Sequence, residues 1–140
     1  MAARRIVNLY TDGGARGNPG PAAIGVVVCG AADEVLQEHR EHIGHATNNE
    51  AEYRALIKGL DLAADLTSTE VRCVMDSELV VRQLTGVYLV KSTSMKHLFD
   101  QVKDRERKFE KVRYRHRPRL TGMLRRADAL VNDALDEAGF

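Results

Sequence analysis

Four acidic residues of this sequence, Asp12, Glu52, Asp76 and Asp128, occupy positions from which their carboxylates could meet. Asp12 and Asp76 each follow a short apolar run with the composition of a strand. Glu52 and Asp128 lie in the first turns of segments that have the apolar spacing of helices. In open sheets covered by helices, ligand sites form outside the ends of central strands. If the two strands are parallel neighbours, we expect the four carboxylates to converge at one rim of the sheet.

Such a cluster favours a chemistry that depends on metal ions. Like charges at close range raise each other's pKa and disfavour ionisation unless a cation compensates them. A set of oxygen ligands without Cys or His suits Mg2+, with Mn2+ as a substitute, rather than zinc. Two such ions roughly 4 Å apart can bind both the attacking water and the leaving oxygen of a phosphodiester.

Each of the four residues also has a purely structural interpretation. Asp12 could form an Asp-Gly hairpin turn, Asp76 could cap the helix that follows it, and the other two could complement helix N-termini. The length of the Gly-rich segment argues against a tight hairpin. Four glycines and two prolines fall within the nine residues after Asp12, and they would let the backbone approach a ligand. No Lys-Ser or Lys-Thr follows these glycines, which excludes a Walker-type phosphate loop. The joint placement of the four carboxylates is what favours a site.

The elements that must position these residues follow from apolar periodicity and turn residues. Three consecutive strands, then alternating helices and strands, predict an α/β fold. Its five-stranded mixed sheet would combine a three-strand antiparallel meander with two parallel strands, with helices on both faces. The strands are predicted over Arg4–Tyr10, Ala22–Cys29, Glu34–Ile43, Val71–Asp76 and Val112–His116, and the helices over about Asn49–Leu66, Glu78–Leu84, Ser94–Phe109 and Leu124–Ala138.

Composition describes an ordinary globular protein. With 44% hydrophobic and 29% charged residues, residues 1–140 are expected to form a single domain. No apolar run approaches the roughly 18 residues of a membrane span, and the N-terminus lacks a signal-peptide pattern. Cys29 and Cys73 lie in apolar runs and are expected to be reduced core residues of a cytoplasmic protein. Because the net charge is only +1, any electrostatic footprint for nucleic acid must be local.

Four strings of the sequence carry a specific resemblance. They resemble the motifs of type I ribonuclease H, in that family's order, and the likeness extends from about Ile6 to Ala138. The resemblance implies a ribonuclease H-like fold and hydrolysis of the RNA strand of RNA–DNA hybrids, with 3'-hydroxyl and 5'-phosphate ends and two Mg2+ ions. It maps the metal-binding carboxylates onto the same four residues as above. The strings are YTDGGARGNPGP from Tyr10, TNNEAEY from Thr47, DSELV from Asp76 and RADAL from Arg126.

The resemblance also implies which residues contact the substrate. Asn18 and the Gly13–Gly14 backbone would contact ribose 2'-hydroxyls, the groups that distinguish RNA from DNA. Thr47 would hold a phosphate of the DNA strand, and Asn49 would contact base edges. Asn48 would help to shape the same groove. Thr47 and the Glu three residues later also fit a capping box at the start of the first helix.

His116 is the remaining catalytic candidate. A lone His at the end of a strand is usually structural or solvated, whereas a His in the loop before the last helix assists proton transfer or product release in the family. The stretch from His116 to Asp128 is about two residues longer than usual in the family and lacks the expected Asn and Glu. The role of His116 therefore stays open at this stage.

Two further patterns involve basic side chains. Lys111, Arg113 and Arg115 fall on one face of their predicted strand. They could protect an edge strand from aggregation or form a stripe that contacts phosphates. The chain has no Trp and no long basic protrusion after the second helix, so hybrid binding must depend on other charges. The spacing of His39, His42 and His45 matches no zinc signature.

These observations predict a monomeric endoribonuclease that acts on RNA–DNA hybrid duplexes and does not associate with membranes. The alternative is a non-catalytic module of the same fold that binds hybrid or double-stranded RNA. A third possibility is a nuclease of this fold that acts on branched DNA. The four carboxylates argue against the binding module, because a binder gains nothing from negative charge placed beside phosphates. Asn18 and the Thr47–Asn49 string favour the hybrid over branched DNA.

Overall fold

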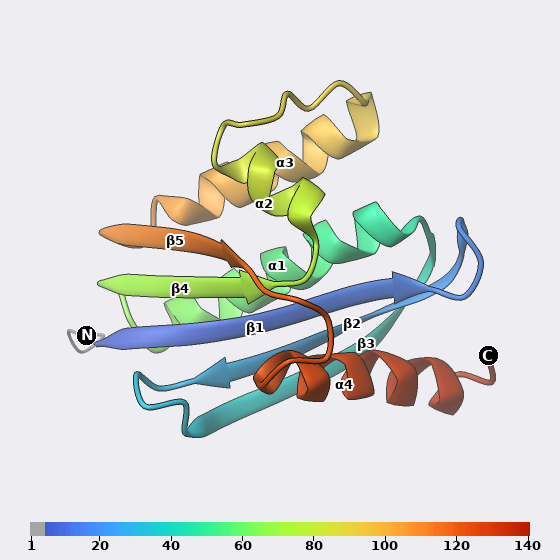
Figure 1. Ribbon diagram of the computed structural model, residues 1–140, viewed down its shortest axis with the longest axis horizontal. Coiled ribbons are helices and arrows are strands. Elements are labelled where there is room, and N and C mark those ends of the chain that lie inside the picture. The colour runs from blue at the N-terminus through green and yellow to red at the C-terminus, as the bar shows by residue number, and fades with distance from the viewer. Residues whose placement is uncertain (1–4) are drawn as a thin grey trace.

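A computed structural model describes residues 5–140 and shows a mixed sheet between two layers of helices (Figure 1). The strands lie in the order β3-β2-β1-β4-β5. The first three strands form the predicted antiparallel meander, and β4 and β5 are parallel to β1 and to each other. The elements are β1 (Ile6–Ala15), β2 (Gly20–Cys29), β3 (Val35–Ala46), α1 (Asn48–Ala64), β4 (Glu70–Met75), α2 (Glu78–Leu84), α3 (Thr93–Glu106), β5 (Lys111–His116) and α4 (Met123–Glu137).

The main core lies between the sheet and the helices α1, α2 and α3. Alternate residues of β1, Val7 and Leu9, are fully buried on this face, as are Leu56 and Leu60 of α1. The opposite face is covered by α4 alone, through two smaller apolar clusters (Figure 1). Since α4 packs on β1, β2 and β3, it leaves β4 and β5 without a covering helix on that face.

The first two strands are longer than predicted, and the turn between them is shorter. β1 continues to Ala15 and β2 begins at Gly20, so the segment expected to be a long Gly-rich turn is mostly sheet. The prediction failed because glycines usually mark turns. In this structure Gly13 instead permits close approach, since a Cβ at this position would lie 2.2 Å from the Ala51 carbonyl carbon of α1.

The other boundaries differ from the predictions by a few residues. β3 extends to Ala46, α1 begins at Asn48 with Thr47 as its N-cap, and β5 begins at Lys111. The predicted capping box is present, because Thr47 and Glu50 exchange side chain to backbone hydrogen bonds. Arg4, the predicted start of the first strand, lies outside the described residues.

Gly25 of β2 determines where α4 lies on the sheet. A Cβ on Gly25 would be 2.3 Å from the carbonyl oxygen of Ala127, so only glycine lets the helix backbone come this close. Gly25 is also the cross-strand partner of Asp12 in the β1–β2 ladder. The close packing therefore brings the second turn of α4, which includes Asp128, to the strand position that carries Asp12.

Candidate active site

The site forms where β1 continues beyond its parallel neighbour. The ladder between β1 and β4 ends at the pair Tyr10 and Val74, whereas the ladder between β1 and β2 continues to Ala15. The edge of β1 from Asp12 onward thus has no partner strand on the β4 side. Asp76 follows the last residue of β4 and lies at this open edge, as the sequence predicted for adjacent parallel strands.

Glu52 reaches the same edge from the first turns of α1. The residue is 6% exposed, and its Oε1 atom accepts a hydrogen bond of 2.8 Å from the Gly13 N–H. The second oxygen, Oε2, is buried and has no hydrogen-bond partner in the structure. A buried polar atom without a partner costs free energy, and in a native fold it calls for a missing partner such as an ion.

Three of the four carboxylates form a tight group. Carboxylate oxygens of Asp12, Glu52 and Asp76 all lie within 4.8 Å of one another, and within residues 5–140 no other group of three or more His, Cys, Asp or Glu residues meets this criterion. Asp128 lines the same cavity of about 350 Å³ but is not a member of the tight group. The four side chains that were predicted to converge therefore face one cavity, with Asp128 on its α4 side.

Asp128 is held by an arginine whose role as its partner was not anticipated. Arg119, in the loop before α4, contributes an Nη2 atom 3.2 Å from Asp128 Oδ1. The next residue, Leu120, has a φ of 63°, a left-handed conformation that is uncommon outside glycine. No local pattern identifies this ion pair, because it depends on how the loop returns to the sheet.

Burial and the close approach of the carboxylates raise the pKa values of the cluster. Burial raises the pKa of Asp12 to about 7, the neighbouring Glu52 carboxyl opposes this shift, and the negative charges of Asp76 and Asp128 add to it. Burial and the neighbouring Asp12 raise the pKa of Glu52. Burial also raises the pKa of Asp76, and the positive charge of Arg119 opposes this shift. Metal-free protein thus disfavours full ionisation of the cluster, and a bound cation would restore it.

These properties fit a divalent metal ion. The ligands are carboxylate oxygens, their oxygens lie close together, and one buried oxygen has no other partner. Hard oxygen donors of this kind suit Mg2+ or Mn2+.

The raised pKa of Asp12 predicts how the stability of the metal-free protein depends on pH. The folded state keeps the Asp12 proton up to about pH 7, whereas an unfolded Asp releases it near pH 3.9. The free energy of unfolding should therefore fall as the pH rises from about 4 to 7. Asp12→Asn removes the cost of keeping an ionised carboxylate buried at this position. We therefore expect the variant to stabilise the metal-free protein at pH 8 by about 1–3 kcal/mol.

Urea unfolding with a chelator at pH 5 and pH 8 measures this effect. Glu52 keeps part of the pH dependence in the variant because its pKa is raised for the same reason. Asp100→Asn, on the exposed face of α3, is the matched control and should show the wild-type pH dependence. A variant Asp12→Asn that is no more stable than the wild type at pH 8 would contradict the electrostatic account.

The helix-capping interpretation of Asp76 is wrong. The N-cap of α2 is Ser77, whose side chain accepts a hydrogen bond from the Val80 N–H. Because Ser77 performs the capping, the carboxylate of Asp76 remains available to the cluster. The hairpin interpretation of Asp12 is also wrong, since Asp12 lies within β1 and pairs with Gly25.

Beside the carboxylates, two asparagines are joined by hydrogen bonds. Asn48 Oδ1 accepts from the Ala15 N–H at 2.8 Å, and the Asn48 N–H donates to Asn18 Oδ1 at 3.0 Å. Asn49 is exposed in the first turn of α1. Gly14, like Asn48, lines the cavity of the carboxylates. The predicted substrate residues of the β1–β2 turn and of the α1 N-terminus are therefore adjacent.

His116 ends β5 opposite Met75, the last residue of β4, and is exposed. Its positive charge, when present, would lower the pKa of Asp76, so it lies on the carboxylate side of the sheet.

The three histidines of β3 form no metal group: His39 pairs with Glu41 at 2.9 Å, and His42 lies against the ring of Phe140. Cys29 and Cys73 are free thiols in the core, as predicted.

Comparison with known proteins places this geometry in a family. Residues 10–134 match the family described as reverse transcriptase-like. The chain is 41% identical to ribonuclease HI of Halobacterium salinarum over 94% of this chain and 65% of that protein. The crystal structure of RNase H1 from the same archaeon superposes with a TM-score of 0.90 at 40% identity, and the match covers 94% of this chain and 98% of that one. The chain belongs to the type I ribonuclease H family.

Two further relatives extend the comparison. The bifunctional protein Rv2228c of Mycobacterium tuberculosis is 46% identical over 94% of this chain, but the match spans only 36% of that protein. The structure of its N-terminal RNase H domain has a TM-score of 0.91 at 45% identity and covers 96% of both chains. LC11-RNase H1, solved in complex with an RNA/DNA hybrid, has a TM-score of 0.87 at 44% identity and covers 94% of this chain and 98% of that one.

Proposed function

We propose that this protein is an endoribonuclease that hydrolyses the RNA strand of RNA–DNA hybrids and leaves 3'-hydroxyl and 5'-phosphate ends. The observation that carries the proposal is the group of Asp12, Glu52 and Asp76, whose carboxylate oxygens lie within 4.8 Å of one another. Membership of the ribonuclease H family and the hybrid-bound structure of LC11-RNase H1 support the choice of substrate.

Asp12, Glu52, Asp76 and Asp128 are the residues that would hold the metal. When bound, a pair of Mg2+ or Mn2+ ions would supply Lewis-acid chemistry that lowers the pKa of a water molecule and stabilises negative charge on the leaving oxygen. Glu52 is fixed for this task by the Gly13 N–H, which orients one oxygen and leaves the other free. Arg119 holds Asp128 on the α4 side of the cavity.

Recognition of the RNA strand would depend on the two linked asparagines. The carbonyl oxygens of Asn18 and Asn48 both accept hydrogen bonds within the protein, so their NH2 groups point elsewhere. Each NH2 group can donate two hydrogen bonds, and neither side-chain nitrogen has a partner among the described residues. A ribose 2'-hydroxyl can accept such bonds and is absent from DNA. Thr47 and Asn49, at the start of α1, would contact the DNA strand.

His116 is proposed to move protons at the exposed side of the carboxylates. An imidazole titrates near neutral pH and can give a proton to a leaving 3'-oxygen. Its place at the end of β5, next to the strand that leads into Asp76, supports this role. The loop of residues 117–122 follows it directly, so a shift of this loop would move the imidazole relative to the carboxylates.

Incubation with matched RNA–DNA, RNA–RNA and DNA–DNA duplexes, with and without Mg2+, tests the proposal. We expect cleavage only of the RNA strand of the hybrid and only with the metal. A non-catalytic binding module would retain the hybrid uncut at every Mg2+ concentration. Cleavage of a branched DNA with the hybrid left intact would identify a different nuclease of the same fold.

We also propose that the protein acts as a monomer in the cytoplasm. The two free thiols in the core are consistent with a reducing compartment. No helix within residues 5–140 is long and apolar enough to cross a membrane. Light scattering and fractionation of cells that express the protein test these two points.

A further inference from the structure

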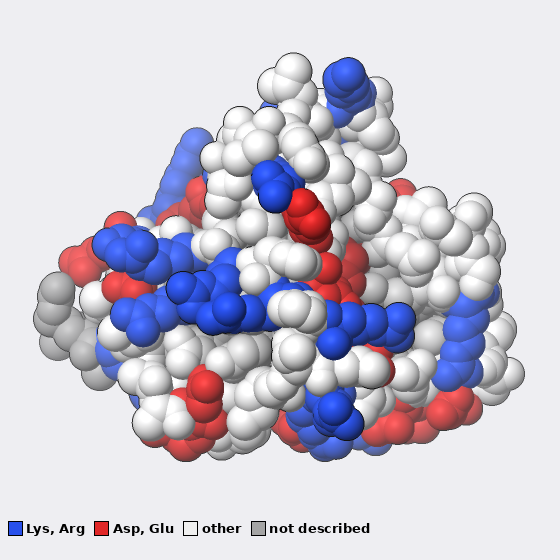
Figure 2. All heavy atoms as spheres, viewed as in Figure 1, with Lys and Arg blue, Asp and Glu red and all other residues white. Residues whose placement is uncertain are grey.

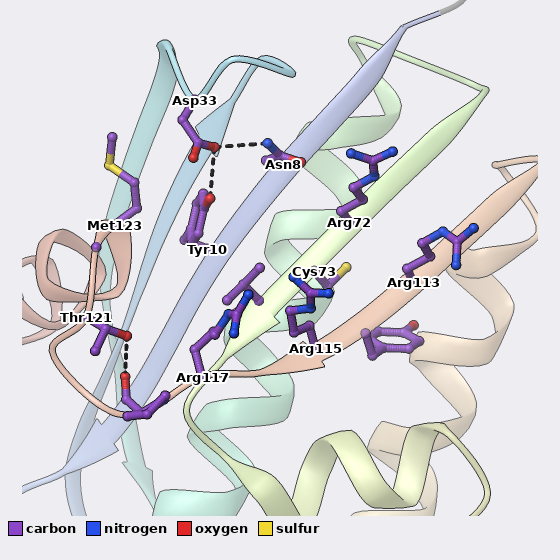
Figure 3. A pocket seen from close by; sticks show the side chains of 14 residues that line it. Asn8, Tyr10, Asp33, Arg72, Cys73, Arg113, Arg115, Arg117, Thr121 and Met123 are labelled. Carbon is purple, nitrogen blue, oxygen red and sulfur yellow. Dashed lines mark hydrogen bonds between the residues drawn. The ribbon is translucent and has the colours of Figure 1, made fainter.

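A second cavity lies outside the carboxylate site, on the face of β4 and β5 that α4 leaves uncovered. It has a volume of about 910 Å³, and its lining includes Arg72 of β4, Arg113 and Arg115 of β5, and Arg117 of the following loop. Figure 3 shows these four side chains on one side of the sheet. We call this cavity the arginine groove.

Two of the four guanidinium groups have acidic partners, and two do not. Glu70 Oε2 lies 2.7 Å from Arg72 Nε and 3.5 Å from Arg113 Nε. Asp33, the only acidic residue among the described residues that line the groove, accepts hydrogen bonds from Asn8 and Tyr10 and pairs with none of the four arginines. The side chains of Arg115 and Arg117 have no hydrogen bond or ion pair with the rest of the described chain. The groove therefore presents uncompensated positive charge.

Protection of an edge strand does not explain this arrangement. Charges serve that purpose on the outermost strand, which here is β5. Arg72, however, lies on β4, which is paired on both sides, and Arg117 lies beyond the end of β5. Groups from two strands and a loop that line one cavity instead indicate a binding surface for an anion.

The groove leads to the carboxylate site. Arg117 and Pro118 line the groove, and Arg119 lines the carboxylate cavity, so one short segment separates the two. Side chains alternate along a strand, so Asp12 faces the same side as Tyr10, which lines the groove. Figure 2 shows basic side chains in a band over β4 and β5 that reaches acidic side chains near the middle of this face.

The size and spacing favour a single strand of nucleic acid. The volume of about 910 Å³ falls within the range of small-ligand pockets, roughly 300–1,000 Å³. Arg113 and Arg115 are two residues apart on one face of a strand, or about 7 Å, a spacing comparable to that of successive phosphates in an extended strand. Positive grooves that follow the backbone, with an aromatic ring such as that of Tyr10 alongside, are typical of single-strand binding.

We propose that the arginine groove binds the phosphate backbone of a single-stranded extension of the RNA strand whose hybrid portion lies at the carboxylate site. The identity of the strand rests on the proposed function, whereas the binding of a single strand does not. Because arginines that contact phosphates do not read sugars or bases, an extension of DNA joined to the same strand should bind as well as one of RNA.

The experiment compares a blunt hybrid with hybrids whose RNA strand carries a single-stranded tail at its 5' or 3' end. Affinities are measured by fluorescence anisotropy in a chelator, so that no strand is cut. We expect one tailed hybrid to bind about tenfold more tightly than the blunt hybrid at low salt. The double variant Arg115→Gln/Arg117→Gln should lose this advantage. Its plot of log affinity against log salt should be less steep by about 1.4, since each single-strand phosphate contact contributes about 0.7.

The control is Arg40→Gln/Arg107→Gln, which removes the same charge from β3 and from the end of α3. It should keep the preference for the tailed hybrid. An equal affinity for tailed and blunt hybrids in the wild type would overturn the proposal, as would equal losses in the two double variants. Competition by an acidic polypeptide as effective as that by single-stranded RNA would also overturn it and would indicate a protein ligand.

The result can be separated from the fate of the proposed function. Cleavage of the hybrid without any effect of the tail would support the ribonuclease assignment and would contradict only the proposal for the groove. Tight binding of single-stranded RNA that depends on Arg115 and Arg117, in a protein that never cuts a hybrid, would support the proposal for the groove and would contradict the proposed activity.

Discussion

Asp76→Asn is expected to lower kcat for hybrid cleavage by at least about a thousandfold, because metal-assisted stabilisation supplies several kcal/mol and each 1.36 kcal/mol is a factor of ten. Asn offers one neutral oxygen in place of a carboxylate, which weakens the metal site that Asp12 and Glu52 share with it. The fold should survive because the Asp76 side chain is only half-buried and Ser77, not Asp76, caps α2.

Single-turnover cleavage of a labelled hybrid, over a titration of Mg2+ and Mn2+, measures this loss. Asp100→Asn on α3 makes the same chemical change at an exposed ion pair and should retain wild-type rates. Circular dichroism and a thermal melt verify that both variants are folded. Near-normal turnover by folded Asp76→Asn would rule out the assignment of the carboxylate cluster as the catalytic centre.

Gly25→Ala is expected to destabilise the protein by about 3 kcal/mol, the upper part of the usual range for an overpacked core. The new Cβ would lie 2.3 Å from the Ala127 carbonyl oxygen and 3.0 Å from the Leu130 Cβ, and neither helix atom can rotate away. The conflict can be relieved only if α4 moves off the sheet. Such a movement would carry Asp128 away from Asp12, so the folded variant should also lose activity.

Equilibrium unfolding in urea measures the change, with Gly14→Ala as the control for stability. A Cβ on Gly14 meets only Val131 Cγ1 at 3.7 Å, an ordinary contact, so this variant should remain within about 0.5 kcal/mol of the wild type. If Gly25→Ala is as stable as Gly14→Ala, then α4 does not depend on close packing over this residue.

The order of strands and helices could be predicted from the sequence because it depends on local patterns. Alternation and helical periodicity identified the elements, and the capping box located the start of α1 to within one residue. Adjacent parallel strands then implied that Asp12 and Asp76 would share one rim. The four motif strings located Glu52 and Asp128 as well, so the four carboxylates of the cavity could be named from the sequence, whereas Arg119 could not.

Only the tertiary structure decided how those constituents meet, because the contacts join residues far apart in the chain. Glycine in a turn and glycine beneath a helix look alike in sequence, so Gly13 and Gly25 acquire their meaning only from the backbones of α1 and α4 that lie against them. The pairing of Arg119 with Asp128 depends on a loop conformation, and the arginine groove exists because α4 covers three strands and leaves two bare. Local periodicity reports which face of an element is apolar, but not which neighbour covers it or where that neighbour ends.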